Sequence, residues 1–147
     1  FPGFYGSWLR KAFYGLTLEY CSIDCSIGFG TTFVTRKSRI EDNVYIGSNC
    51  VISYAHIGQD VLIGSGVHVL SGKGQHVFDD TSTPIRLQGG EKNLITIGED
   101  SWIGNGSIIM ANVGPKCVVA AGSVVTKDIE ELSIVAGNPA KLIRRRA

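Results

Sequence analysis

Aliphatic side chains recur every six residues along most of the chain, each followed by a small or polar turn residue. A helix of about 3.6 residues per turn cannot keep such a repeat on one face, whereas six residues can supply one short strand and one turn. Stacked units of this kind bury a continuous apolar column that no single unit buries alone. The pattern therefore predicts an all-β solenoid. The ladder positions are Ile27, Phe33, Ile40, Ile46, Ile52, Ile57, Ile63, Val69, Ile97, Ile103, Ile109, Val113, Val119 and Val125.

A second pattern accompanies the ladder, because a small or short side chain often follows four residues after a ladder position. This set comprises Thr31, Cys50, Val61, Val67, Ser101, Ser107, Cys117 and Ser123. With Cys21 and Cys25 placed one repeat earlier, all four cysteines are interpreted as buried apolar side chains. The alternative, a metal or redox pair at Cys21 and Cys25, lacks a second ligand pair. A chain that needs no disulfide suits a reducing, cytoplasmic location.

Three segments depart from the ladder. Residues 7–20 carry apolar side chains at helical spacing, and we expect a helix there that caps the open end of the solenoid. Anchoring to a membrane surface is the alternative, but only Arg10 and Lys11 are basic in this helix. Residues 71–94 form one long inserted loop. Pro139 suits the first turn of a short C-terminal helix within residues 136–147.

Composition agrees with one globular domain over residues 1–147, with the solenoid at 21–70 and 95–135. The 147 residues are 44% hydrophobic and 18% charged, and 14 basic residues nearly balance 13 acidic ones. This balance argues against disorder and against a nucleic-acid partner. No apolar run approaches the roughly 18 residues of a membrane span, so none is expected.

The three histidines differ in their setting. His68 lies inside a repeat and His56 ends a shortened one, so both are interpreted as surface or hydrogen-bonded side chains. His76 lies within the inserted loop, followed by Asp79 and Asp80. A neutral imidazole near pH 7 is a ready general base, although an exposed loop histidine without a function remains the simpler alternative from the residues alone.

The ladder, together with Trp102-Ile103-Gly104, the stretch AGSVVTKD at 121–128 and AGNPA at 136–140, resembles the hexapeptide-repeat acyltransferases. The resemblance is closest to the sugar O-acetyltransferases of the galactoside, maltose and capsular-polysaccharide type. It implies a left-handed parallel β-helix that works as a homotrimer with active sites between subunits. It also implies acetyl-CoA as co-substrate, no metal, and acetyl transfer to a hydroxyl of a sugar or polysaccharide precursor through a ternary complex.

The resemblance assigns roles to particular residues. His76 matches the catalytic base, with Asp79 or Asp80 as a possible orienting group. The residues matching the coenzyme site are Trp102, Asn105, Ala121, Thr126, Lys127, Lys141 and Arg144, the last two at positions that receive the phosphates. Simple packing at a subunit interface is the alternative for Trp102, and a solvated tail is the alternative for the two basic residues. Gly47 stands where galactoside enzymes carry an acceptor-side Asn, which leaves the acceptor open.

Other functions remain open at this point. The acceptor could be an amino sugar, serine or an antibiotic. A zinc carbonic anhydrase on the same fold needs three gathered imidazoles, whereas His56, His68 and His76 are spaced by 12 and 8 residues. A non-catalytic scaffold is the third hypothesis, although a bare scaffold needs neither the inserted loop nor the basic tail.

Overall fold

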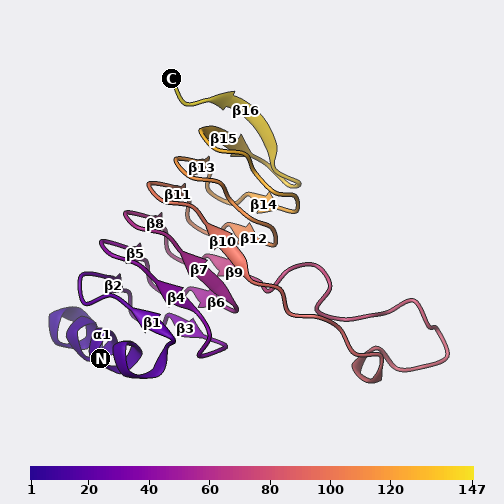
Figure 1. Ribbon diagram of the computed structural model, residues 1–147, viewed down its shortest axis with the longest axis horizontal. Coiled ribbons are helices and arrows are strands. Elements are labelled where there is room, and N and C mark those ends of the chain that lie inside the picture. The colour runs from indigo at the N-terminus through magenta and orange to yellow at the C-terminus, as the bar shows by residue number, and fades with distance from the viewer.

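Three parallel β-sheets form the walls of a solenoid in a computed structural model that describes residues 1–147 (Figure 1). Successive coils contribute short strands to the three sheets in turn, and beyond β10 (Ile95–Ile97) isolated bridges at Val113 and Ile129 take the place of strands on one wall. We name the sheets A (β1-β4-β7-β10), B (β16-β15-β13-β11-β8-β5-β2) and C (β14-β12-β9-β6-β3). Every strand pair is parallel except β15 with β16. The predicted all-β solenoid of stacked repeats is confirmed.

Most strands are only two residues long, as a six-residue repeat requires. One α-helix precedes them, and one 3₁₀ turn interrupts them. The elements are α1 (Gly3–Thr17), β1 (Tyr20–Cys21), β2 (Ser26–Ile27), β3 (Thr32–Phe33), β4 (Arg39–Ile40), β5 (Tyr45–Ile46), β6 (Val51–Ile52), β7 (Ala55–Ile57), β8 (Leu62–Ile63), β9 (His68–Val69), η1 (Ile85–Leu87), β10 (Ile95–Ile97), β11 (Trp102–Ile103), β12 (Ile108–Ile109), β13 (Val118–Val119), β14 (Val124–Val125), β15 (Ser133–Ala136) and β16 (Lys141–Arg145).

The ladder residues form the core. They point inward in register from one coil to the next, so that Ile46 lies between Ile27 and Ile63 in sheet B. Each of these three side chains is fully buried. Phe33, nearest the N-terminal end of sheet C, is only half-buried. Stacking therefore buries a continuous apolar column that no single repeat could bury alone.

The small side chains beside the ladder bond one coil to the next. The Thr31 hydroxyl donates to the Gly47 carbonyl at 2.7 Å, and the Ser101 hydroxyl donates to the Gly114 carbonyl at 3.0 Å. The Cys117 thiol donates to the Glu130 carbonyl at 3.0 Å. A short donor fits at these corners and satisfies a carbonyl that would otherwise be buried without a partner.

The cysteines are all free thiols, and three of the four are buried as predicted. Cys21 is only half-buried, with its Sγ 3.4 Å from the Sγ of Cys25. The hydrogen bond to Cys25, with burial, raises the pKa of the Cys21 thiol. Burial also raises the pKa of the Cys117 thiol. Raised pKa values keep these thiols protonated and weakly nucleophilic.

The N-terminal helix lies across the end of the solenoid, as predicted for a cap (Figure 1). Its apolar side faces outward, however, and not toward the core. It runs from Gly3 to Thr17 and not from residue 7 to 20. The apolar residues expected to cover the core point outward, since Trp8 is 62% and Leu16 89% exposed. Tyr14 packs against the core instead. This helix is neither long nor apolar enough to cross a membrane.

The short C-terminal helix predicted from Pro139 is wrong. The chain turns at Gly137, which has a φ of 104°, and β16 returns antiparallel along β15. Without this strand, β15 would leave a row of unpaired backbone groups at the edge of sheet B. Pairing that edge outweighs the local helix signal at Pro139.

The corner glycines are where the coils approach most closely. A Cβ at Gly47 would lie 2.6 Å from the Ser65 nitrogen, a backbone atom that cannot move aside. We therefore expect Gly47→Ala to lower the free energy of unfolding by about 1–3 kcal/mol, measured by chemical denaturation. Gly15→Ala is the matched control, because nothing lies within 4 Å of a Cβ there. In a helix it should be neutral or stabilising, and equal losses for both variants would contradict this account.

Candidate functional site

The inserted loop leaves the edge between sheets C and A, after β9, and returns to it at β10 (Figure 1). Its two arms are held together by backbone bonds. The Asn93 N–H donates to Ser71 O at 3.0 Å, and the Val77 N–H donates to Gly89 O at 3.0 Å. Between these bonds lies His76. The loop is therefore an ordered two-armed stem that projects from the solenoid.

The far end of the loop is organised by one amide side chain. Gln88 Nε2 donates to Asp80 O at 2.7 Å and to Thr83 O at 2.6 Å, while its Oε1 accepts from Asp80 N–H at 3.2 Å. The Asp80 carboxylate in turn accepts from the Ser82 N–H at 2.8 Å and from its hydroxyl at 2.6 Å. The sequence analysis missed Gln88, because side-chain to backbone bonds across a loop leave no periodic pattern.

His76 is exposed on the loop stem. Asp80 does not orient it, since the Asp80 carboxylate is bonded to Ser82. The hydrogen bonds from Ser82 and Thr83 lower the pKa of Asp80 to about 2. Asp79 is exposed. The imidazole of His76 is thus free to meet a ligand or a neighbouring subunit.

Trp102 and Arg144 line one groove on the outer face of sheet B. Trp102 is 55% exposed and lies between Leu62 and Val118 on neighbouring strands. The groove has a volume of about 430 Å³ and is also lined by Asp60, Asp100, Ser101, Ile134 and Arg146. An aromatic ring beside a guanidinium is a surface suited to an apolar chain that ends in an anion.

The three tail arginines differ in their partners. Arg145 pairs with the Glu130 carboxylate. Arg146 Nη1 donates to Asp100 O at 3.1 Å and to Lys116 O at 3.2 Å, which ties the tail to two coils. Arg144 bonds only the carbonyl of Arg145, at 3.0 Å. Lys141 is exposed at the start of β16 and lies outside the groove. Arg144 is the tail arginine that has no acidic partner.

Asn105 and Ala121 lie together at the corner between sheets B and C, on neighbouring coils. The Gly122 N–H donates to Asn105 O at 2.8 Å. Asn105 Oδ1 accepts the Ser65 N–H at 3.1 Å. The side chain of Asn105 therefore already bridges two coils, which leaves its NH₂ group for a ligand.

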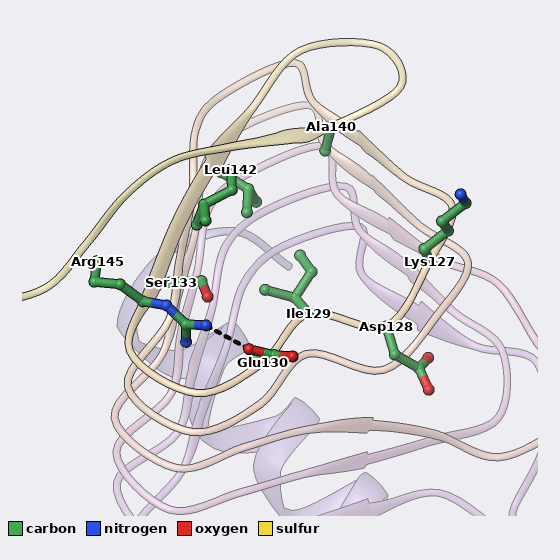
Figure 2. Close-up of a pocket in the computed structure, with 9 residues that line it drawn as sticks. Lys127, Asp128, Ile129, Glu130, Ser133, Ala140, Leu142 and Arg145 are labelled. Atoms are coloured by element: carbon green, nitrogen blue, oxygen red, sulfur yellow. Dashed lines mark hydrogen bonds and ion pairs between the residues drawn. The ribbon is translucent and has the colours of Figure 1, made fainter.

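Thr126 and Lys127 lie at the corner between sheets C and A. Lys127 lines a separate cavity of about 290 Å³ at the C-terminal end of the solenoid. Figure 2 shows this cavity beneath Ala140 and Leu142, with the Glu130–Arg145 ion pair on its opposite side from Lys127. The predicted coenzyme residues are thus distributed over three places.

One chain does not bring His76 and Trp102 together. The loop that carries His76 leaves the edge between sheets C and A, whereas Trp102 lies on sheet B, the wall opposite that edge. A site that uses both side chains needs a second copy of the chain. The other two histidines are elsewhere, with His56 on sheet A bonded to Glu41 at 2.9 Å and His68 on sheet C. No group of three or more His, Cys, Asp or Glu side chains gathers as a metal site.

Gly47 has a backbone reason for carrying no side chain. It packs against the corner formed by Gly64 and Ser65 of the next coil. Asn49, two positions on, adopts a φ of 56° in the turn.

Comparison with known proteins agrees with this fold. A family model described as the hexapeptide repeat of succinyl-transferase matches residues 38–71 and 94–127, the solenoid on either side of the loop. A Saccharomyces cerevisiae protein named as an acetyltransferase is 40% identical over 113 residues, which cover 70% of this chain and 56% of that protein. The chain therefore belongs to the hexapeptide-repeat acyltransferase family, although it spans little more than half the length of that relative.

Two solved structures extend the comparison to nearly the whole chain. A hexapeptide-repeat acetyltransferase of Vibrio cholerae complexed with acetyl coenzyme A has a TM-score of 0.80 and 25% identity, covering 95% of this chain and 78% of that one. A galactoside acetyltransferase in complex with coenzyme A has a TM-score of 0.79 and 25% identity, covering 94% and 70%. Both neighbours were solved with this coenzyme or its acetyl form bound.

The loop stem depends on Gly90, which packs against the peptide joining Gln75 to His76. A Cβ there would overlap the Gln75 carbonyl and lie 2.8 Å from His76 N, and the φ of 150° also disfavours a side chain. We expect Gly90→Ala to separate the two arms and to speed trypsin cleavage at Arg86 at least severalfold, with the melting temperature nearly unchanged. Limited proteolysis with mass spectrometry measures this.

Gly74→Ala is the matched control for Gly90→Ala, because it lies on the same stem with nothing within 4 Å of its Cβ. Its cleavage rate should equal that of the unmodified protein. If both variants are cleaved alike, the close contact of Gly90 does not hold the stem.

Proposed function

We propose that the protein is an acetyl-CoA-dependent O-acetyltransferase that acts on a hydroxyl of a sugar or polysaccharide precursor. The observation that carries the proposal is a single ordered loop with an exposed histidine, inserted into a hexapeptide-repeat solenoid. The neighbour named as a galactoside acetyltransferase supports a sugar acceptor, and the coenzyme complexes support the donor. The four free thiols suit a cytoplasmic location.

His76 is the general base in this mechanism. Its neutral imidazole takes the proton as the acceptor oxygen attacks the thioester carbonyl of acetyl-CoA. The new C–O bond forms, the C–S bond breaks, and the coenzyme thiolate leaves with the proton returned by His76. Acceptor and donor are bound together, so no acyl-enzyme forms.

The donor lies along the groove on sheet B. The ring of Trp102 flanks the acetyl-pantetheine arm, and Arg144 with Lys141 receives the phosphates through charge-assisted hydrogen bonds. Asn105 contributes its free NH₂ group. The family resemblance also assigns Ala121, Thr126 and Lys127 to the coenzyme, although Thr126 and Lys127 lie at the corner between sheets C and A, outside this groove.

The active protein is a homotrimer with sites between subunits. His76 and Trp102 lie on opposite sides of one chain, so they meet only when the loop of one copy reaches the groove of the next. The outer face of sheet B carries an apolar row suited to such contact, with Tyr45, Leu62 and Trp102 each about half exposed.

His76→Ala should lower kcat for acetyl transfer by about 10²–10⁴-fold, because general-base catalysis is lost. The dissociation constant for acetyl-CoA should stay unchanged. A saccharide panel assayed for thiol release gives the rate, and calorimetry gives the affinity. His68→Ala is the control on the outer face of sheet C and should keep full activity. Full activity of His76→Ala would exclude it as the base.

Replacing Lys141 and Arg144 together by Ala should weaken binding of coenzyme A by about a hundredfold or more, since each charge-assisted hydrogen bond contributes about 1.5–3 kcal/mol and about 1.4 kcal/mol corresponds to a factor of ten. Isothermal calorimetry measures this without any acceptor. Arg145→Ala is the control, because Arg145 already pairs with Glu130. It should affect stability more than affinity. An unchanged affinity in the double variant would remove these two residues from the donor site.

A further inference from the structure

The helix α1 presents an unbroken apolar face to its surroundings. This face has no charged side chain, and its large members are between 47% and 89% exposed. We call it the apolar face of α1; it comprises Phe4, Tyr5, Trp8, Leu9, Ala12, Phe13 and Leu16. At about 3.6 residues per turn these positions share one side of the helix. A cap that served only the core would show the opposite pattern.

Specific hydrogen bonds hold the helix in this orientation. Arg10 Nε donates to Ile27 O at 2.8 Å, and the Tyr14 hydroxyl donates to Thr31 O at 3.0 Å. Both bonds use polar groups of the helix against backbone carbonyls of the first coil. The polar side of α1 is therefore bound to the protein, and its apolar side is turned outward.

The apolar surface continues onto the first coil on both sides of the helix. Ile23, 75% exposed, lines a cavity of about 430 Å³ together with Trp8 and Leu16. On the other side Val34, 59% exposed, shares a groove with Phe13. The helix and the turns of the first coil thus form one apolar end of the molecule.

Charge indicates what covers this end. Lys11 on the helix and Arg36 and Lys37 on the first coil are basic. The Arg10 guanidinium is bonded to backbone carbonyls of the protein. Of the acidic residues at this end, Glu19 pairs with Arg39, and Asp24 is exposed. Four of the seven residues of the apolar face are aromatic, including a Trp and a Tyr, the side chains that favour the boundary between headgroups and acyl chains. Basic residues around an aromatic apolar face match an anionic lipid surface.

We propose that the apolar face of α1 docks the protein on an anionic lipid surface. The helix lies across the N-terminal end of the solenoid (Figure 1), so docking leaves the three sheets and the inserted loop clear of the bilayer. The attachment is peripheral. It does not depend on acetyl transfer, and it can hold or fail whatever the acceptor is.

The two tryptophans allow a direct test. In the Trp102→Phe variant, Trp8 is the sole tryptophan reporter. We expect its emission to shift to shorter wavelength on addition of vesicles of phosphatidylcholine with phosphatidylglycerol, and to be quenched by brominated acyl chains. Replacing Phe13 and Leu16 by Gln should lower the vesicle partition coefficient by about tenfold or more, since each loses most of its apolar transfer energy. Both residues are largely exposed, so we expect the fold to be retained.

Ile85→Gln is the matched control, because Ile85 is 54% exposed on the loop and far along the chain from α1. It should leave partition unchanged. A Trp8 emission insensitive to vesicles overturns the proposal. The proposal is also overturned if Trp8 emission is already at shorter wavelength in buffer and the Phe13 and Leu16 variant forms a smaller assembly. Those two results together would show that protein covers this face. Coenzyme binding measured on the protein that keeps Trp102 reports separately on the proposed activity.

Discussion

The close stacking of successive coils is the constraint on which the rest of the structure depends. Hydrogen-bonded parallel strands lie about 4.8 Å apart. The turns that join them must therefore stack at the same spacing. Gly47 and Gly64 meet the requirement by having no side chain, and Thr31 and Ser101 meet it with short hydroxyls that bond the next corner. A side chain at Gly47 or Gly64 would have to push two coils apart, because backbone atoms of the next coil lie within 3 Å of the Cβ position.

A stack this regular leaves chemistry to the places where the repeat is interrupted. The inserted loop is the longest interruption, and it is ordered by the hydrogen bonds of Gln88 and by the close packing of Gly90 against the opposite arm. The tail is the second. There, Arg145 and Arg146 are held by acidic or carbonyl partners, while Arg144 faces the groove beside Trp102. Of these three consecutive arginines, two stabilise the fold and one is free to bind a ligand.

The two errors of the sequence analysis share a cause. Helical spacing at Trp8 and Leu16 indicated an amphipathic helix, but the spacing does not say which side faces the protein. The bonds from Arg10 and Tyr14 to first-coil carbonyls decided that. At the C-terminus, Pro139 suited a helix, but the open edge of β15 required a partner strand. Both outcomes were set by unsatisfied backbone groups on another part of the chain.

The sequence by itself determined the solenoid, the core ladder and the position of the loop. The six-residue repeat is a local pattern that recurs in every coil, so it can be recognised without knowing the fold. It also marked His76, Trp102 and Arg144 by residue type and resemblance. Only the tertiary structure decided that Trp102 and Arg144 share a groove while His76 leaves the opposite edge. The sheet on which a residue lies depends on the number of residues in all the turns before it. Each shortened repeat changes that number.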